Sequence, residues 1–313
     1  MGVAGKLREL RVRASGDQSR RLPEAFYEHV NARRRGLEIG GPSALFGERG
    51  LLPVYSVLES VDCVQWATST FWHDLDPTIG FAPDGKTTGK LHILDDVGLA
   101  TLPSEHYDLV LSSHVIEHIA NPLRALAAWR RVMVSGGYVL TVAPHITATF
   151  DRRRAVTQLE HMIADFDQMI GEDDLTHLDE TLRLHDRRRD ILPFDTAQLA
   201  AKFRDNAHTR FLHHHTFTTF SLGALLRHAG LEIVAAEARL PHDIYMLARW
   251  PAGDGAAADG DSAQVLIGAA RRSAFRIDRR LARSAPGSLN PEPASADSVG
   301  VSMPHPPADG ARR

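Results

Sequence analysis

Cysteine is almost absent from this chain of 313 residues, in which Cys63 is the single one. One cysteine cannot form an intramolecular disulfide, which excludes a disulfide-stabilised secreted fold and favours a reducing compartment. Long hydrophobic runs are missing as well, since none approaches the roughly 18 to 20 apolar residues that a membrane-spanning helix needs. The first residues are basic and polar and lack the apolar centre of a signal peptide. We therefore expect a cytoplasmic protein.

The chain also lacks an excess of basic charge. Its 36 lysines and arginines stand against 39 acidic residues, which gives a formal net charge of -3. Proteins that bind nucleic acid by bulk charge need a basic excess to neutralise phosphates, so we expect no nucleic-acid partner. What the chain has is 43% hydrophobic and 24% charged residues. These values are ordinary for a globular protein with a sizeable core.

Composition divides the chain into three parts. Residues 1–21 are basic and polar without an apolar period, which predicts a flexible arm. Residues 22–250 carry regular apolar patterns and are expected to form the folded domain. Residues 251–313 are rich in Ala, Gly, Asp, Pro and Ser and are predicted to be largely disordered. Within them, residues 264–283 could form a basic amphipathic helix that packs loosely on the domain or contacts a membrane surface or another protein.

Short apolar segments alternate with helical patterns through the domain. A helix from about 121 to 134 begins with Asn121 as N-cap and Pro122 in its first turn. A second helix over 218–228 precedes the last two strands, which we expect to pair antiparallel at the sheet edge. This alternation predicts an α/β fold with a Rossmann-like doubly wound, mostly parallel seven-stranded sheet, whose ligand site lies at the carboxyl ends of the strands. The expected strands are 37–43, 61–66, 91–94, 107–112, 138–143, 231–236 and 244–249.

Residues 146–215 interrupt the alternation with a charged, histidine-rich segment. Part of it has helical periodicity, because Leu159, Met162, Ile163 and Phe166 lie on one helix face. We interpret the segment as an inserted helical lid that binds an acceptor. Its arginines suit anionic groups, which they can bind with two parallel hydrogen bonds.

The loop after the first strand carries Gly40 and Gly41. Glycine lets a ligand approach the backbone closely, and backbone N–H groups left unpaired at a strand end can face a polar or anionic group. Glu38 precedes the loop and could bind a cationic or hydroxyl group of the same ligand. A carboxylate at this position does not suit a pyrophosphate, which is itself negative.

Three segments in order carry a family resemblance. Residues 37–43 (LEIGGPS), residues 108–118 (DLVLSSHVIEH) and residues 136–138 (GGY) together resemble the class I S-adenosylmethionine-dependent methyltransferases, and among them the broad type 11 group. The match covers about residues 35–145 and continues over 216–250. The resemblance implies S-adenosylmethionine as the cofactor and an enzyme that transfers a methyl group.

The resemblance also implies roles for particular residues. Glu38, Gly40 and Gly41 would cradle the methionine part of the cofactor, and Ser113 and His114 would approach it from the other side. The family's glycine-rich motif is shortened here, because Pro42 and Ala44 stand where further glycines are common. Two further positions concern the nucleoside. Asp95 or Asp96 would bind the adenine amino group. Gln65 stands about where an acid usually binds the ribose hydroxyls, and the nearest acid, Asp62, lies three residues earlier.

Methyl transfer to a hydroxyl needs a base, and histidine is the natural one near neutral pH. We expect His145, at the end of strand 138–143, to be this base. His118 is a second candidate, although it could simply pack and hydrogen-bond near its strand. His214 is the third, as a member of the run 213–215, in which at least one side chain should face the site because consecutive residues cannot all point one way.

The polar residues of the lid leave two alternatives open. Histidine and carboxylate suit zinc, iron or manganese, but their spacing matches no metal signature, and we expect no metal site. A site rich in hydrogen bonds favours oxygen methylation of a polar small molecule or a sugar or glycan, although nothing in the sequence separates it from nitrogen or carbon methylation. Other classes remain: a catalytically silent cofactor-binding or interaction protein, or an NAD(P)-dependent oxidoreductase, which would need G-x-G-x-x-G after the first strand.

Overall fold

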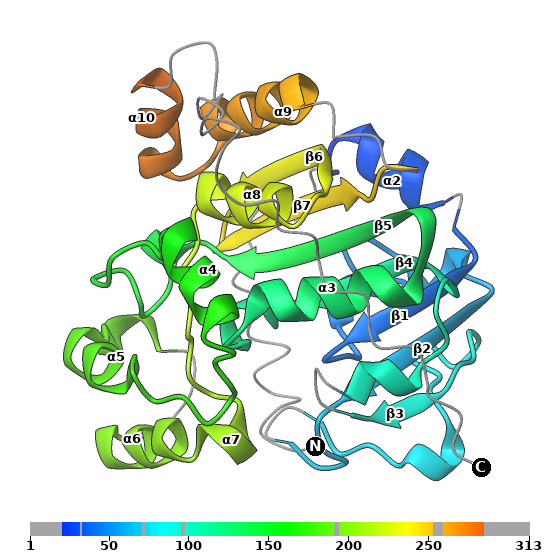
Figure 1. Cartoon of the computed structure of the whole chain (residues 1–313), viewed down its shortest axis with the longest axis horizontal. Helices are drawn as coiled ribbons and strands as arrows, with labels where there is room; N and C mark the ends of the chain where they lie inside the picture. The colour runs from blue at the N-terminus through cyan, green and yellow to red at the C-terminus, as the bar shows by residue number, and fades with distance from the viewer. Residues whose placement is uncertain are drawn as a thin grey trace, which may run out of the picture.

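The computed structural model describes residues 21–31, 33–70, 73–94, 98–190, 194–252 and 259–284, which form a layered fold around one sheet (Figure 1). The order of its seven strands is β3-β2-β1-β4-β5-β7-β6. The first five run parallel, and β7 is antiparallel to both of its neighbours. The predicted seven-stranded sheet and its antiparallel edge are thus confirmed. The strands are β1 (Arg35–Ile39), β2 (Ser60–Gln65), β3 (Leu91–Ile93), β4 (Tyr107–Ser113), β5 (Met133–Pro144), β6 (Glu232–Arg239) and β7 (Asp243–Arg249).

Both faces of the sheet are covered, which explains the continuous apolar runs. In β4, Leu109, Val110 and Leu111 are all fully buried, with alternate residues in two different core clusters. The helices that cover one face are α3 (Pro122–Val132), α4 (Leu159–Asp167), α8 (Thr219–His228) and α9 (Asp259–Arg272). The other face is covered by α2 (Glu24–Val30) and by Phe46, Leu52 and Tyr55. The start of α3 is as predicted, because the Asn121 side chain accepts a hydrogen bond from the Arg124 N–H.

The strand–helix alternation that we expected throughout fails in the first half of the sheet. Between β1 and β4, the described residues contain only short 3-10 turns in place of α-helices. After β1, the chain contains glycine and proline residues that prevent an α-helix, since both residue types disfavour helix interiors; they are Gly41, Pro42, Gly47, Gly50 and Pro53. The turns are η1 (Ala44–Phe46), η2 (Tyr55–Val57), η3 (Pro77–Ile79) and η4 (Gly98–Thr101).

The segment inserted after β5 is helical, as predicted. Besides α4 it contains α5 (Leu178–Leu184), α6 (Thr196–Arg204) and α7 (Asn206–Thr209), and these three lie together at the lower left of Figure 1. They enclose a small apolar cluster of their own, in which Phe203 and Leu212 are fully buried. The insertion is therefore a subdomain with its own core.

The prediction for the region after residue 250 is wrong in two respects. The single helix expected over 264–283 is two helices, α9 and α10 (Arg276–Ser284), and α9 packs on β6. The break follows from Ser273, whose hydroxyl accepts the Phe275 N–H and donates to Asp278. Leu266 is buried while Leu281 is 40% exposed, so no single apolar stripe runs through both helices. The folded domain thus extends to Ser284, and residues 1–20 and 285–313 lie outside the described part.

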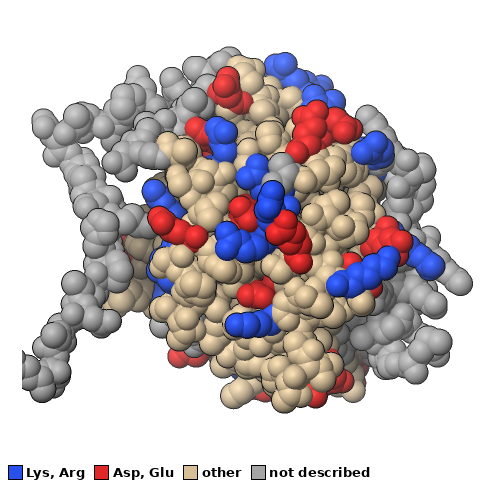
Figure 2. Space-filling view, turned by 90° about the vertical axis from the view of Figure 1, so that its right-hand side faces the viewer, with Lys and Arg blue, Asp and Glu red and all other residues tan. Residues whose placement is uncertain are grey.

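Charged side chains of both signs are interspersed on the molecular face shown in Figure 2, where the described residues form no extended patch of one sign. Among the described helices, none combines the length and the apolar character needed to cross a membrane.

Candidate functional site

A cavity of about 610 Å³ lies at the carboxyl ends of the parallel strands, where open α/β sheets bind their ligands. Its volume is that of a small-molecule site. The strand ends form one wall, which we call the strand wall, and the inserted segment forms the other, the insertion wall. The strand wall contains Ile39, Gly40, Val64, Gln65, Leu94, Ser113 and His114, and the insertion wall contains Phe150, His185, Arg189, Phe203, Phe211 and His213.

Gly40 occupies the turn that begins the strand wall. Its φ of 76° lies in the left-handed region, and a Cβ at this position would lie 2.6 Å from Cγ2 of Val115. The position therefore requires glycine. Its N–H donates to the Val64 carbonyl, which ties the end of β1 to β2. Gly40 thus lets a ligand in the cavity come close to the backbone, while its own N–H forms a hydrogen bond within the sheet.

Glu38 shapes this loop from behind and does not line the cavity. Its carboxylate is 1% exposed and accepts hydrogen bonds from the Ser43 N–H at 2.9 Å and from the Tyr55 hydroxyl at 2.8 Å. A Cβ on Gly41 would overlap with this carboxyl group, so Gly41 leaves room for it. Burial raises the pKa of Glu38 to about 8. The direct ligand contact expected of Glu38 and Gly41 is corrected to a role in holding the loop.

Gln65 and Ser113 line the cavity as predicted. The Gln65 amide donates to the Gly41 carbonyl, and its buried Oε1 has no hydrogen-bond partner among the described residues. Asp62, the alternative to Gln65, instead accepts hydrogen bonds from the Lys90 N–H and the Tyr107 hydroxyl, outside the cavity lining. The two candidates for adenine binding, Asp95 and Asp96, lie outside the described residues.

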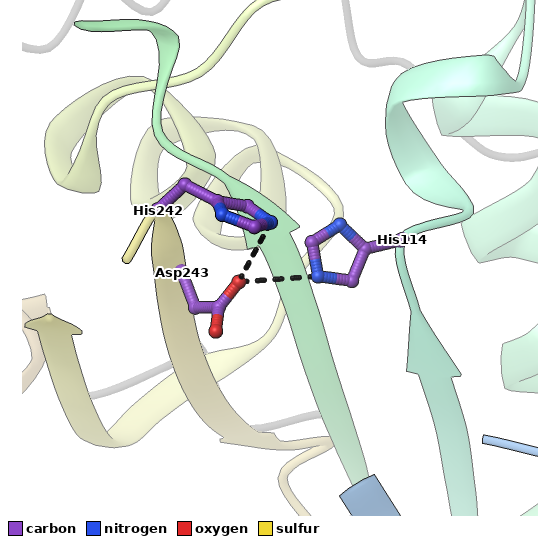
Figure 3. Close-up of side chains that lie close together, drawn as sticks. All are labelled: His114, His242 and Asp243. Carbon is purple, nitrogen blue, oxygen red and sulfur yellow. Dashed lines mark ion pairs between the residues drawn. The ribbon is translucent and has the colours of Figure 1, made fainter. Parts of the chain in front are cut away.

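His114 follows β4 and lies in an ion-paired group at the edge of the cavity (Figure 3). Its Nε2 is 3.1 Å from Asp243, which also lies 3.5 Å from His242. Its Nδ1 is 3.6 Å from Glu117. Burial lowers the pKa of His114, but hydrogen bonds to Asp243 and Glu117 outweigh it and raise the pKa to about 9. His114 is therefore a cation at neutral pH and cannot serve as a base.

His118 and His213 face the cavity from opposite walls, with their ring centres 4.5 Å apart. The Nδ1 of His118 is 3.1 Å from the Leu212 carbonyl, and burial together with His213 lowers its pKa to about 4. The Nδ1 of His213 is 2.5 Å from Oδ2 of Asp151. The other carboxylate oxygen of Asp151 accepts a hydrogen bond from Arg154. A carboxylate on Nδ1 fixes the tautomer in which Nε2 accepts protons. The prediction that one member of 213–215 faces the site is correct for His213.

The other two predicted bases lie away from the cavity. His145 is fully buried, with Nε2 3.4 Å from Asp278 and its ring stacked on Phe275 of the segment between α9 and α10. We expected it at the site because it ends β5, but the chain after residue 250, expected to be disordered, covers it. His214 is 1% exposed and hydrogen-bonds to Asn206, and burial lowers its pKa to about 3. Both positions are corrected from catalytic to structural.

Sequence reasoning chose His214 over His213 within the run 213–215, and it missed Asp151 and Asp243. The pairing of His213 with Asp151 spans 62 positions, which no local pattern reveals. Asp243 is the first residue of β7, and since an antiparallel strand begins where its parallel neighbours end, its position was a usable signal.

Comparison with known families decides the assignment. The chain matches the methyltransferase-domain family over residues 8–236, which is well over half of its length. It belongs to this family. The match and the sheet order confirm the prediction of a class I methyltransferase with S-adenosylmethionine as its cofactor. Among curated proteins, no significant relative was found.

Solved structures similar to this methyltransferase share little sequence with it. One is a SAM-dependent methyltransferase from Aquifex aeolicus, with 11% identity over 80% of this chain and 100% of that chain and a TM-score of 0.38. Another comes from Methanosarcina mazei, with 15% identity over 74% and 100% and a TM-score of 0.42. An N-methyltransferase from Bradyrhizobium japonicum has 12% identity over 76% and 98% and a TM-score of 0.40. Similarities this low carry no conclusion about the acceptor.

Proposed function

We propose that this methyltransferase transfers a methyl group to a hydroxyl oxygen of a polar small molecule or a sugar or glycan held between the two walls. The observation that carries the proposal is the His213–Asp151 pair, because its histidine faces the same cavity as Gly40 and Gln65. A base is needed for a hydroxyl acceptor, and this pair supplies one on the side opposite the strand ends.

The strand wall suits S-adenosylmethionine in three respects. Gly40 allows close approach to the backbone, and the partnerless Oε1 of Gln65 can accept a hydrogen bond from a ribose hydroxyl. Asp243 and Glu117, the two carboxylates that flank His114 in the cavity lining, suit the ammonium group of the methionine part. The cofactor supplies the methyl group on a sulfonium, and the strand wall holds it in place for in-line displacement.

The insertion wall supplies the proton transfer. With Nδ1–H of His213 held by Asp151, Nε2 removes the proton from the acceptor hydroxyl as the oxygen forms its bond to the methyl carbon. The bond between that carbon and the sulfur breaks, so S-adenosylhomocysteine leaves neutral at sulfur and His213 becomes protonated. Asp151 stabilises this imidazolium, because its carboxylate is charged: burial raises its pKa, but His213 and Arg154 outweigh burial and lower it.

The same wall offers surfaces that suit a polar ring. Phe150 and Phe211 contribute apolar side chains to the lining, and Arg189 lies in the same lining. Sites for small polar ligands combine apolar walls with a few directed polar groups in this way. These residues support a sugar or a similar hydroxylated ring as the acceptor.

Radiolabelled S-adenosylmethionine, incubated with the protein and a panel of sugars and hydroxylated small molecules, tests the proposal. We expect a methyl ether in the product and S-adenosylhomocysteine in equal amount. His213→Asn keeps a side-chain N–H near Nδ1 but removes Nε2, so turnover should fall by about 10²- to 10⁴-fold. The exposed His208–Asp205 pair provides the control, since His208→Asn should leave turnover unchanged. Methylation of nitrogen or carbon, or full turnover by His213→Asn, would overturn the proposal.

A further inference from the structure

A second group of histidines lies in the insertion, outside the cavity lining. His161 and Asp165 occupy one face of α4, His177 precedes α5, and His215 belongs to the run after α7. The Nε2 atoms of His161 and His177 are 3.0 Å apart, and Nε2 of His161 is 3.5 Å from Oδ2 of Asp165. Nε2 of His215 is 3.9 Å from the same oxygen. Three segments that are separate in sequence thus bring potential ligand atoms close together.

These side chains are poorly satisfied by the protein itself. Asp165 is 8% exposed, and its Oδ2 has no hydrogen-bond partner among the described residues. The Nδ1 of His215, a residue that is 1% exposed, also has none. A buried polar atom without a partner is costly, and such atoms are rare in folded proteins. Two facing Nε2 atoms at 3.0 Å require that one ring donates to the other or that both lone pairs point at a shared cation.

We propose that His161, Asp165, His177 and His215 bind one zinc ion. Zinc takes nitrogen and oxygen ligands in tetrahedral geometry with bonds of about 2.0–2.1 Å, which places ligand atoms about 3.4 Å apart. The separations of 3.0 Å between Nε2 of His161 and Nε2 of His177 and of 3.5 Å between Nε2 of His161 and Oδ2 of Asp165 lie on either side of this value. His161, Asp165 and His215 each offer a ligand atom within 4.8 Å of the other two, and Nε2 of His177 lies 3.0 Å from Nε2 of His161.

The surroundings of the group match those of metal ligands. Nε2–H of His215 donates to the Ala120 carbonyl at 3.2 Å, which leaves the partnerless Nδ1 of this ring as the ligand atom, and the backbone carbonyl of Asp165 accepts a hydrogen bond from Asn121. Second partners of this kind orient metal ligands. His161, whose side chain is 41% exposed, leaves a path from solvent.

Zinc here would fix the insertion to the sheet domain. It would join α4 and the segment before α5 to the run that contains His213, and both anchoring contacts lie at Ala120 and Asn121, at the start of α3. The site is therefore structural, with all four ligands from protein. It does not depend on the proposed acceptor or base.

Two other groups have the composition of a metal site, and both face the cavity. In the first, Nε2 of His114 already pairs with Asp243 at 3.1 Å and its Nδ1 faces Glu117 at 3.6 Å. In the second, Glu117 joins His118 and His213, and His114 already neutralises Glu117 through an ion pair. The zinc affinity of a His118 variant therefore shows whether zinc binds in the cavity or in the insertion.

Calorimetric titration of the full chain with zinc chloride, after treatment with a chelator, tests the proposal. We expect one equivalent to bind with micromolar or tighter affinity, and cobalt to give the intense visible absorption of tetrahedral coordination. His161→Gln and Asp165→Asn should each weaken binding by about 100-fold or more, whereas His118→Asn and His208→Gln should not. Circular dichroism of each variant shows whether it is folded.

Three results would overturn the proposal: no zinc bound by the folded wild type, unchanged affinity in both His161→Gln and Asp165→Asn, or loss of binding in His118→Asn alone. Because His161 is largely accessible and Asp165→Asn preserves shape, at least one of these variants should fold. Zinc should also raise the melting temperature of the wild type but not that of Asp165→Asn. None of these measurements depends on methyl transfer.

Discussion

The two walls of the cavity are held in place by different interactions. The strand wall presents backbone and short side chains, and the register of β1, β2 and β4 positions them. The insertion wall presents ionisable side chains that hold each other in pairs, such as His213 with Asp151. Geometry set by a sheet survives the loss of one side chain, whereas geometry set by a polar pair depends on both partners. Substitutions in the two walls should therefore have separable effects, on cofactor binding for one and on chemistry or stability for the other.

The largest expected effect is on the insertion wall, at Asp151. Asp151→Asn lets His213 adopt the wrong tautomer and removes the stabilising charge, so kcat should fall by about 10²- to 10⁴-fold. Affinity for S-adenosylhomocysteine, measured by calorimetry, should stay unchanged, because the strand wall is intact. Asp205→Asn, in the matching exposed pair, should affect neither quantity. A loss of cofactor affinity in Asp151→Asn would show that the walls are not separable.

A second substitution tests the buried contacts of Asp278, which lies beside His145, the residue directly before the insertion. Asp278 is fully buried and accepts hydrogen bonds from Thr219 at 2.6 Å and Ser273 at 2.8 Å, beside His145. Asp278→Ala leaves these groups without a partner and should lower the free energy of unfolding by about 3 kcal/mol. Asp179 is also acidic in the first helical turn but is exposed, so Asp179→Ala should cost at most about 0.5 kcal/mol. Urea denaturation checks both values.

Urea denaturation, combined with a measurement of kcat, also tests the role of His145. If this residue is structural, His145→Gln should lower stability while kcat at a permissive temperature stays near that of the wild type. A loss of kcat by 100-fold in folded His145→Gln would restore it as the base.

A smaller effect is expected on the strand wall, at Gln65. Gln65→Ala removes one hydrogen bond to the ribose, so affinity for S-adenosylmethionine should fall about tenfold, equivalent to about 1.4 kcal/mol. Asp62→Asn should leave the affinity unchanged, because Asp62 does not line the cavity. If Asp62→Asn has the larger effect in calorimetry, the ribose lies elsewhere.

A separate, pH-dependent effect on stability concerns Glu38. Its pKa of about 8 in the fold exceeds its ordinary value of 4.5, so the native state holds a proton that the unfolded chain releases between these values. The free energy of unfolding must then fall as pH rises from 4.5 through 8. Glu38→Gln mimics the protonated group and should remove this slope. We expect its melting temperature to exceed that of the wild type increasingly towards pH 8, and parallel pH profiles would contradict the shifted pKa.

What the sequence predicted well depends on local chemistry. The buried strands, the Asn121 cap and the turn at Gly40 each follow from neighbouring residues, and Gln65 and Ser113 line the cavity because strand ends fix them. Glu38 failed because the loop folds back on its carboxylate through Ser43 and Tyr55.

The insertion was less predictable because its contacts join distant positions. His213 could not be chosen over His214 without Asp151, and His145 could not be excluded without Asp278, which lies 133 residues further on. The four-residue spacing of His161 and Asp165 was visible on one helix face, but the other two partners of the group were not. Fold and cofactor followed from local patterns, and the base did not.

One measurement tests most directly whether the strand wall binds the cofactor. Gly40→Ala and Gly136→Ala place the same backbone strain on glycines with φ of 76° and 75°, and Gly40→Ala also brings a Cβ to 2.6 Å from Val115, but only Gly40 lines the cavity. Each should cost about 1–2 kcal/mol of stability. In calorimetry with S-adenosylmethionine and S-adenosylhomocysteine, we predict at least tenfold weaker binding by folded Gly40→Ala and wild-type binding by Gly136→Ala. Equal affinity in the two variants, or binding of NADH in place of either ligand, would contradict the account.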